Sequence, residues 1–352
     1  MPTEPRVNQL SPDGYSRFYY LVDILHEAFK DSKKTVNILD VGGGSEYLDQ
    51  QLKDSGLNYR LTILDVLPRP LSVTGDYIQA DATSMKLDNN SFDAVVSTDV
   101  IEHIPQELKV DFLSECVRVA KDVCIIAGPF DTEGVHEVEV IVNDFNKQLF
   151  GTGQSWLEEH FQFGKPSMAL FKETLQTIGM PYDCFGTLSL TTWLLNTHIN
   201  LIDAKLGLDA DAHRLLNSFY GENILEMNEI GVPTYRQFFV IYKQERLAGK
   251  LNIQKYLCGP LNHKKFSSYL SLLIQLLSTR ISELKLQDEQ ALQRIFDLEI
   301  ANIANLDELE KLRIKVGEQA GVLDKIRPLL ALVRSKPIRT VRILFSRSHK
   351  IT

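Results

Sequence analysis

From residue 15 to residue 243, short apolar runs alternate with segments whose apolar residues recur at helical spacing. The runs predict strands at residues 36–41, 59–66, 76–80, 91–98, 123–128, 182–187 and 235–242. The helical spacing predicts helices at 15–29, 46–56, 105–120 and 166–179, with a further apolar, helical insertion at 189–226. Residues 130–164 fit neither pattern. This alternation of strands and helices predicts an α/β fold around a mostly parallel sheet.

The C-terminal third has a different period. Steps of seven residues from Ile274, and again from Leu277, meet apolar side chains at fourteen of eighteen positions up to residue 333. This spacing predicts a helix from about 266 to 327 that self-associates as a coiled coil, with Asn302 and Asn305 fixing its register. An amphipathic helix that lies on the chain's own globular part would show the same pattern.

These patterns divide the chain as follows: an N-terminal cap helix at 1–34, a globular domain at 35–245 with insertions near 130–165 and 189–230, a linker at 246–265, a coiled coil at 266–333 and a tail at 334–352. The tail carries six basic residues, no acidic residue and apolar positions at helical spacing. It therefore suits either the surface of an anionic membrane or a solvated basic end.

Charge and cysteine content narrow the function classes. The net charge is −8, and the residues before the tail carry 32 basic against 46 acidic side chains, which argues against nucleic-acid binding. The four cysteines are far apart and fit reduced thiols, and the first residues contain no apolar signal core. We therefore expect a cytoplasmic protein, with peripheral contact to the inner membrane if the tail binds lipid.

Polar residues and glycines follow the predicted strands at the points where each strand ends. Asp40 lies near the end of the first strand, the turn Gly42-Gly43-Gly44 follows it, and a helix start comes next. Such a turn lets the backbone approach a ligand closely. The ends of the next three strands carry the side chains Asp65, Asp81 with Ala82, and Asp99. Because the ends of parallel strands meet at one edge, a single ligand can contact all of them.

The phrase FDAVVSTDVIEHIP at residues 92–105 resembles the fourth motif of class I S-adenosylmethionine (SAM) methyltransferases, in the subgroup of ubiquinone and menaquinone C-methyltransferases. The resemblance covers about residues 35–243. It implies a seven-stranded Rossmann-like sheet whose last strand runs antiparallel at the far end, and SAM as the cofactor. It also implies that Asp40 and the glycines hold the methionine end, Asp65 the ribose hydroxyls and Asp81 the adenine, with Ala82 and Asp99 nearby.

Methyl transfer to a hydroxyl or a carbon requires the removal of a proton. His103 is the first candidate for this base and Glu102 the second, because both follow the fourth strand. His136 and His160 are alternatives, and each of these histidines also suits a purely structural role. No spacing of histidine or cysteine indicates a metal site.

The resemblance leaves the acceptor open among small molecules, sugars and lipid-linked glycans. The arrangement of a methyltransferase-like domain followed by a coiled coil and a basic tail is similar to that of bacterial enzymes that modify surface polysaccharides. Two other functions compete. An NAD-dependent oxidoreductase would share the glycine turn, but Tyr47 stands where its third glycine belongs, and Asp81 also counts against it. A non-catalytic scaffold would use the coiled coil to organise partners.

Overall fold

The computed structural model describes residues 11–43, 47–71, 73, 75–207, 214–215, 217–219, 233–248, 251, 263–300 and 315. The chain divides into two compact units. The larger unit comprises residues 1–201 and 209–270, and the smaller comprises residues 202–208 and 271–352. The larger unit contains every strand described below.

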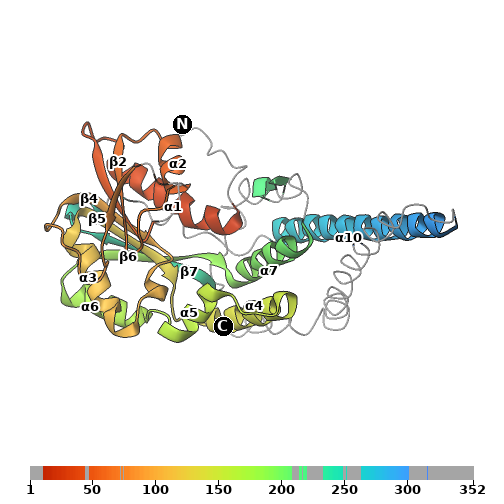
Figure 1. Ribbon diagram of the computed structural model, residues 1–352. Coiled ribbons are helices and arrows are strands. Elements are labelled where there is room, and N and C mark those ends of the chain that lie inside the picture. Colours follow the sequence, from red (N-terminus) through yellow and green to blue (C-terminus); the bar gives the residue numbers. More distant parts are fainter. Residues whose placement is uncertain are drawn as a thin grey trace. The chain divides into compact units, whose positions relative to one another are not determined.

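A seven-stranded mixed sheet forms the centre of the larger unit (Figure 1). Its strands are β1 (Val36–Val41), β2 (Tyr59–Asp65), β3 (Asp76–Gln79), β4 (Phe92–Thr98), β5 (Ala120–Pro129), β6 (Tyr182–Ser189) and β7 (Thr234–Tyr242). Their spatial order is β3-β2-β1-β4-β5-β7-β6. The first five strands are parallel, and β7 runs antiparallel to both of its neighbours.

The predicted strands are confirmed to within three residues at each end. The runs β1, β4 and β5 are apolar because they lie in the middle of the sheet, covered on both faces. The predicted antiparallel direction of the last strand is also confirmed. Its position differs from the expectation, because β6 takes the outer edge and β7 fills the space between β5 and β6.

Helices cover both faces of the sheet, with α1 (Pro12–Phe29) and α2 (Tyr47–Asp54) on one side and α3 (Lys109–Val119) and α6 (Met168–Thr177) on the other (Figure 1). Helix α1 begins three residues before the predicted range of 15–29, because the Ser11 side chain caps it by accepting a hydrogen bond from the Gly14 amide at 3.2 Å. The helix expected from Pro105 begins later. Two 3₁₀ turns, η1 (Ile101–His103) and η2 (Gln106–Leu108), precede α3.

Two helices occupy the stretch that the sequence left unassigned. These are α4 (Val135–Phe150) and α5 (Ser155–Phe163), and both contribute buried side chains. The predicted helical insertion after β6 begins with α7 (Leu190–Leu206), and the short α9 (Glu245–Ala248) follows β7. The remainder of that insertion lies largely outside the described residues.

The smaller unit contains most of α10 (His263–Ile300), a long helix where the sequence predicts one. The coiled coil itself stays a prediction, and Ile274 at the first seam position is 61% exposed. The later seam positions, Asn302 and Asn305, and the basic tail lie outside the described residues. Over the described part of the chain, no helix has both the length and the hydropathy to cross a membrane.

Candidate active site

A pocket of about 720 Å³ opens at the edge where β1, β2, β3 and β4 end. Of the residues that the sequence singled out, it brings six together in its lining: Gly42, Asp65, Asp81, Ala82, Asp99 and His103. The edge arises because parallel strands place all their carboxyl ends on one side. We call this hollow the first pocket.

The turn after β1 leaves no room for side chains. Gly42 has a φ of +75°, and a Cβ atom there would overlap the side chain of Val100. A Cβ at Gly43 would overlap the carboxylate of Asp40. Asp40 is therefore packed behind the turn and is not among the residues that line the first pocket. Its contact with the methionine end of SAM stays a prediction. Burial raises the pKa of Asp40 to about 7. Gly44 lies outside the described residues.

The two acids after β2 and β3 are fixed by their own loops. The Asp65 carboxylate accepts a hydrogen bond from the amide of Leu67 at 2.8 Å. Asp81 accepts two hydrogen bonds from Thr83, one from the amide at 2.8 Å and one from the hydroxyl at 2.7 Å. These Asx-type turns hold both carboxylates in place at the wall of the first pocket.

Asp99, at the end of β4, faces a buried charge network rather than the first pocket alone. Its backbone is left-handed, with a φ of +53°. Its carboxylate binds both Arg17, at 2.6 Å, and the fully buried Arg236 of β7. Arg236 also reaches Ser16 at 2.6 Å and Asp13 at 3.0 Å on α1. Burial raises the pKa of Asp13, but Arg236 and Arg17 outweigh it and lower that pKa to about 2.

The second pocket, of about 370 Å³, lies beside the first and shares Asp99 and His103 with it. Its other lining residues come from distant parts of the chain: Ser11, Asp13, Arg17, Glu102, Trp156, His160, Trp193, Thr197, Asn200, Tyr235 and Arg236. The rings of Trp193 and Tyr235 stack with centroids 3.9 Å apart. This pocket is therefore partly aromatic and partly ionic.

The candidate bases lie on η1, between the two pockets. Lys109 holds this turn, because its buried amine donates to the carbonyl of Ile101 at 2.8 Å and to that of Ile104 at 2.5 Å. Glu102 is 1% exposed, and burial raises its pKa well above the ordinary value. Burial, followed by the neighbouring His160, lowers the pKa of His103.

His160 of α5 meets His103, whereas the other alternative base does not join the site. The Nε2 atoms of His160 and His103 are 3.4 Å apart. His136 instead contacts the ring of Phe161, with centroids 5.6 Å apart, and lines neither pocket.

Sequence reasoning missed the partners of these residues. Arg17, Glu139 and Arg236 hold the site together, yet none follows a parallel strand. One signal was available for Arg236, because it is the one charged residue in the last strand. A buried charge in a central strand requires partners, and these come from Asp99 at the end of β4 and from Asp13 on α1.

Comparisons with known proteins agree with this geometry. Residues 39–127 match the family model described as "Methyltransferase domain". An uncharacterized methyltransferase of Mycolicibacterium gilvum is 30% identical over 155 residues, and one of Mycolicibacterium vanbaalenii is 26% identical over 159. Each alignment covers 38% of this chain, and the chain spans 58% of the length of each relative.

Among solved structures, the phosphoethanolamine N-methyltransferase 2 of Haemonchus contortus, in complex with phosphomonomethylethanolamine and S-adenosylhomocysteine, is similar. It is 19% identical with a TM-score of 0.42, over 68% of this chain and 55% of that one. This likeness carries no information about the acceptor. Over residues 39–127 the chain is therefore similar to a methyltransferase domain, and the described sheet has the seven strands and the antiparallel last strand that the resemblance implies.

Proposed function

We propose that the protein transfers the methyl group of SAM to an acceptor held in the second pocket. The observation that carries this proposal is the pair of adjoining pockets, one of about 720 Å³ and one of about 370 Å³, with Asp99 and His103 in both walls. The first volume lies within the range of small-molecule and cofactor sites. A two-substrate transfer requires such a pair, because its reacting atoms must come within contact distance.

The residues of the first pocket suit SAM. Gly42 gives the cofactor close access to the backbone, and Asp65 offers two acceptor oxygens to ribose hydroxyls. Asp81 and Ala82 stand where the adenine would lie. When bound, SAM supplies an activated methyl group on a sulfonium, so the protein's own residues need only bind, align and exclude water. The resemblance of residues 92–105 to the subgroup of ubiquinone and menaquinone C-methyltransferases supports the same assignment.

The second pocket suits an acceptor with an uncharged, ring-shaped part. Trp193 and Tyr235 offer a stacked aromatic wall, and the nearby charges of Arg17 and Arg236 are already paired with Asp13 and Asp99. We infer a hydroxyl or carbon acceptor of the small-molecule, sugar or lipid-linked glycan class. His103 is our candidate base, because it lies in both walls.

Calorimetry tests the cofactor. SAM should bind the wild-type chain, and Asp65→Ala should weaken that binding at least tenfold, because the ribose hydroxyls lose an ionic acceptor worth about 1.5–3 kcal/mol. Asp76→Ala is the matched control, since Asp76 begins the neighbouring strand, pairs with Arg60 and does not line the first pocket. Absence of SAM binding by the wild-type chain would refute the proposal.

An assay with methyl-labelled SAM on fractionated extracts tests the transfer, and the labelled product identifies the acceptor. SAM binding without transfer to any small-molecule, glycan or lipid fraction would favour the non-catalytic scaffold. A response to NAD, with none to SAM, would favour the oxidoreductase.

We further propose that the C-terminal helix joins copies of the chain and that the tail contacts the cytoplasmic face of the inner membrane. The heptad pattern and the six basic residues of 334–352 support these proposals. Sedimentation of the whole chain tests the first. Deletion of residues 334–352 tests the second, since membrane partitioning that survives the deletion would contradict it.

A further inference from the structure

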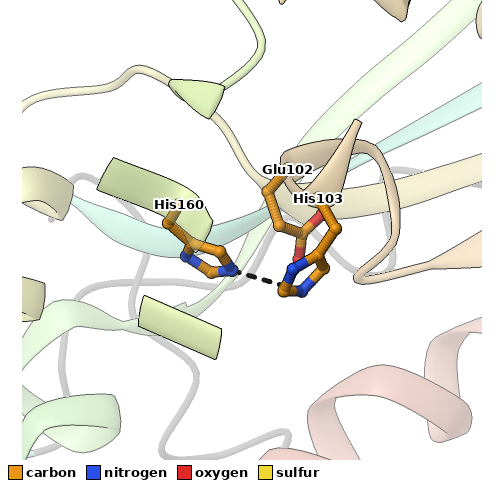
Figure 2. A group of neighbouring side chains, drawn as sticks. All are labelled: Glu102, His103 and His160. Carbon is orange, nitrogen blue, oxygen red and sulfur yellow. Dashed lines mark hydrogen bonds between the residues drawn. The ribbon is translucent and has the colours of Figure 1, made fainter. Parts of the chain in front are cut away.

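Two histidines from separate elements face each other at the wall of the second pocket. His103 comes from η1 and His160 from α5, 57 residues later. Their rings have centroids 4.7 Å apart, and their Nε2 atoms are 3.4 Å apart (Figure 2). His160 is 2% exposed, so it meets its neighbours in the protein interior and not in water.

The tautomer of each ring is set by a carboxylate on its far side. Glu159 lies 2.7 Å from Nδ1 of His103, and Glu139 lies 2.9 Å from Nδ1 of His160. An ionised carboxylate only accepts hydrogen bonds, so both rings carry their proton on Nδ1. In the neutral rings the two Nε2 atoms, 3.4 Å apart, then each carry a lone pair, and these lone pairs repel each other. A positive charge between them, either a proton or a cation, removes this repulsion.

Glu102 supplies a third ligand atom, and its environment decides between a proton and a cation at this place. Its Oε2 atom is buried and has no hydrogen-bond partner among the described residues. The ligand atoms of Glu102, His103 and His160 all lie within 4.8 Å of one another. A shared proton would satisfy the two imidazoles and leave this carboxylate oxygen unpaired. A metal ion satisfies all three.

The separation of the two nitrogens indicates the coordination geometry. Two nitrogens that each lie about 2.1 Å from a tetrahedral zinc ion are about 3.4 Å apart. Adjacent ligands of an octahedral ion at the same bond length are only about 3.0 Å apart. The distance of 3.4 Å between the two nitrogens is close to the tetrahedral value, whereas the ligand atoms of the whole group are up to 4.8 Å apart, so the Glu102 carboxylate would move closer as the ion binds.

The surroundings resemble those of metal sites beyond the ligands themselves. Carboxylates on the far nitrogens orient metal-binding imidazoles and increase their basicity. Glu139 is itself fixed, with Lys165 at 2.7 Å and the hydroxyl of Tyr235 at 3.0 Å. Glu139 is fully buried, so this support is rigid.

We propose that Glu102, His103 and His160 form a binding site for a divalent cation of the zinc type, with an open fourth position toward the second pocket. This revises the expectation of no metal, which rested on spacing along the sequence. Binding of the ion is independent of the proposed function. Only its use rests on that function: with the ion bound, Nε2 of His103 is a ligand and takes no proton, and the cation instead lowers the pKa of an acceptor hydroxyl.

Titration of the chelator-treated full chain with Zn²⁺, in competition with a chromophoric chelator, measures the affinity. One ion should bind each chain. Co²⁺ in its place should give the strong visible absorption of a four-coordinate ion, and this readout needs no variant. A chain that takes up no stoichiometric Zn²⁺, or a Co²⁺ spectrum typical of six-coordinate aqueous cobalt, would overturn the proposal.

Variants assign the ligands. His160→Gln and His103→Gln should each weaken Zn²⁺ binding by more than about 100-fold, and Glu139→Gln by about 10- to 100-fold. His26→Gln is the matched control, since His26 lies on α1 and lines neither pocket. Equal affinity in His160→Gln and His26→Gln would refute the assignment. Circular dichroism confirms that each variant is folded.

SAM calorimetry on the same samples separates this proposal from the proposed function. Zn²⁺ binding without SAM binding would leave the metal site standing and refute the transfer of a methyl group from SAM. If the wild-type chain binds SAM but does not bind Zn²⁺, the metal site is refuted and the proposed function stands.

Discussion

The two adjoining pockets are built in different ways from the same sheet. The glycine and the acids of the first pocket follow successive parallel strands, so one rule of topology places them together. The second pocket draws on α1, α5, α7 and β7, elements separated by more than 200 residues of sequence. A ligand site at strand ends can therefore be predicted from a pattern, whereas a site between insertions depends on their packing.

Two aspartates show the same contrast in their charges, the buried Asp40 and the partly exposed Asp13. Asp40, behind the turn of the first pocket, has a pKa raised to about 7 because it is buried. Asp13, beside the second pocket, has a pKa lowered to about 2, because two arginines outweigh its burial. Burial alone therefore does not decide the charge of an acid in this protein. The partners supplied by distant elements decide it.

The largest effect should come from removing Arg236, the fully buried cation of the second pocket. Arg236→Met leaves Asp13 and Asp99 without their fully buried partner, and we expect a loss of about 3–5 kcal/mol in the free energy of unfolding. Urea denaturation measures it. The matched control is Arg246→Met, which breaks the ion pair between Arg246 and Asp122. The Arg246 side chain is 67% exposed, so this variant should lose only about 0–1 kcal/mol in the free energy of unfolding. Equal losses in the two variants would show that the buried network is not structural.

The next effect concerns Asp40 and pH. Its folded pKa of about 7 lies above its unfolded value, so the folded state retains a proton that the unfolded state loses. Stability should therefore fall as pH rises from about 4 to about 7, by at most about 1.4 kcal/mol per pH unit. Asp40→Asn should remove the part of this slope that Asp40 contributes, while the part from the buried Glu102 remains, and should become the more stable protein at pH 8. Unfolding curves at several pH values test this, and an unchanged slope in the variant would contradict it.

Much of the first pocket could be predicted from the sequence, because β1, β2, β3 and β4 are marked by local apolar runs. Helix α4 was missed although Val135, Val138 and Val142 share one helical face. Its valines also alternate with other residues at 138, 140 and 142, which is the spacing of a strand. The meeting of His103 and His160 has no local signal at all, since only the packing of α5 beside η1 creates it.

Two glycines with similar backbones sharpen the test of the first pocket. Gly42 has a φ of +75° and Gly56 a φ of +73°, so alanine at either position should cost about 1–2 kcal/mol of stability. Only at Gly42 would the new methyl group also overlap Val100. We expect Gly42→Ala to lose at least tenfold in SAM affinity, while Gly56→Ala binds SAM normally. Equal SAM affinities, measured by calorimetry, would show that the turn does not contact the cofactor.

The smallest effect concerns the hydrogen bonds that orient His160 at the wall of the second pocket. Tyr235→Phe removes one hydrogen bond to Glu139, which keeps its contacts with His160 and Lys165. We expect a loss of about 1 kcal/mol in unfolding free energy and a decrease of less than about tenfold in Zn²⁺ affinity. Tyr77→Phe removes a hydroxyl whose bond to the Leu67 carbonyl is exposed, and should change neither quantity measurably. A Zn²⁺ affinity unaltered by Tyr235→Phe, despite its lower stability, would show that Glu139 orients His160 without help from β7.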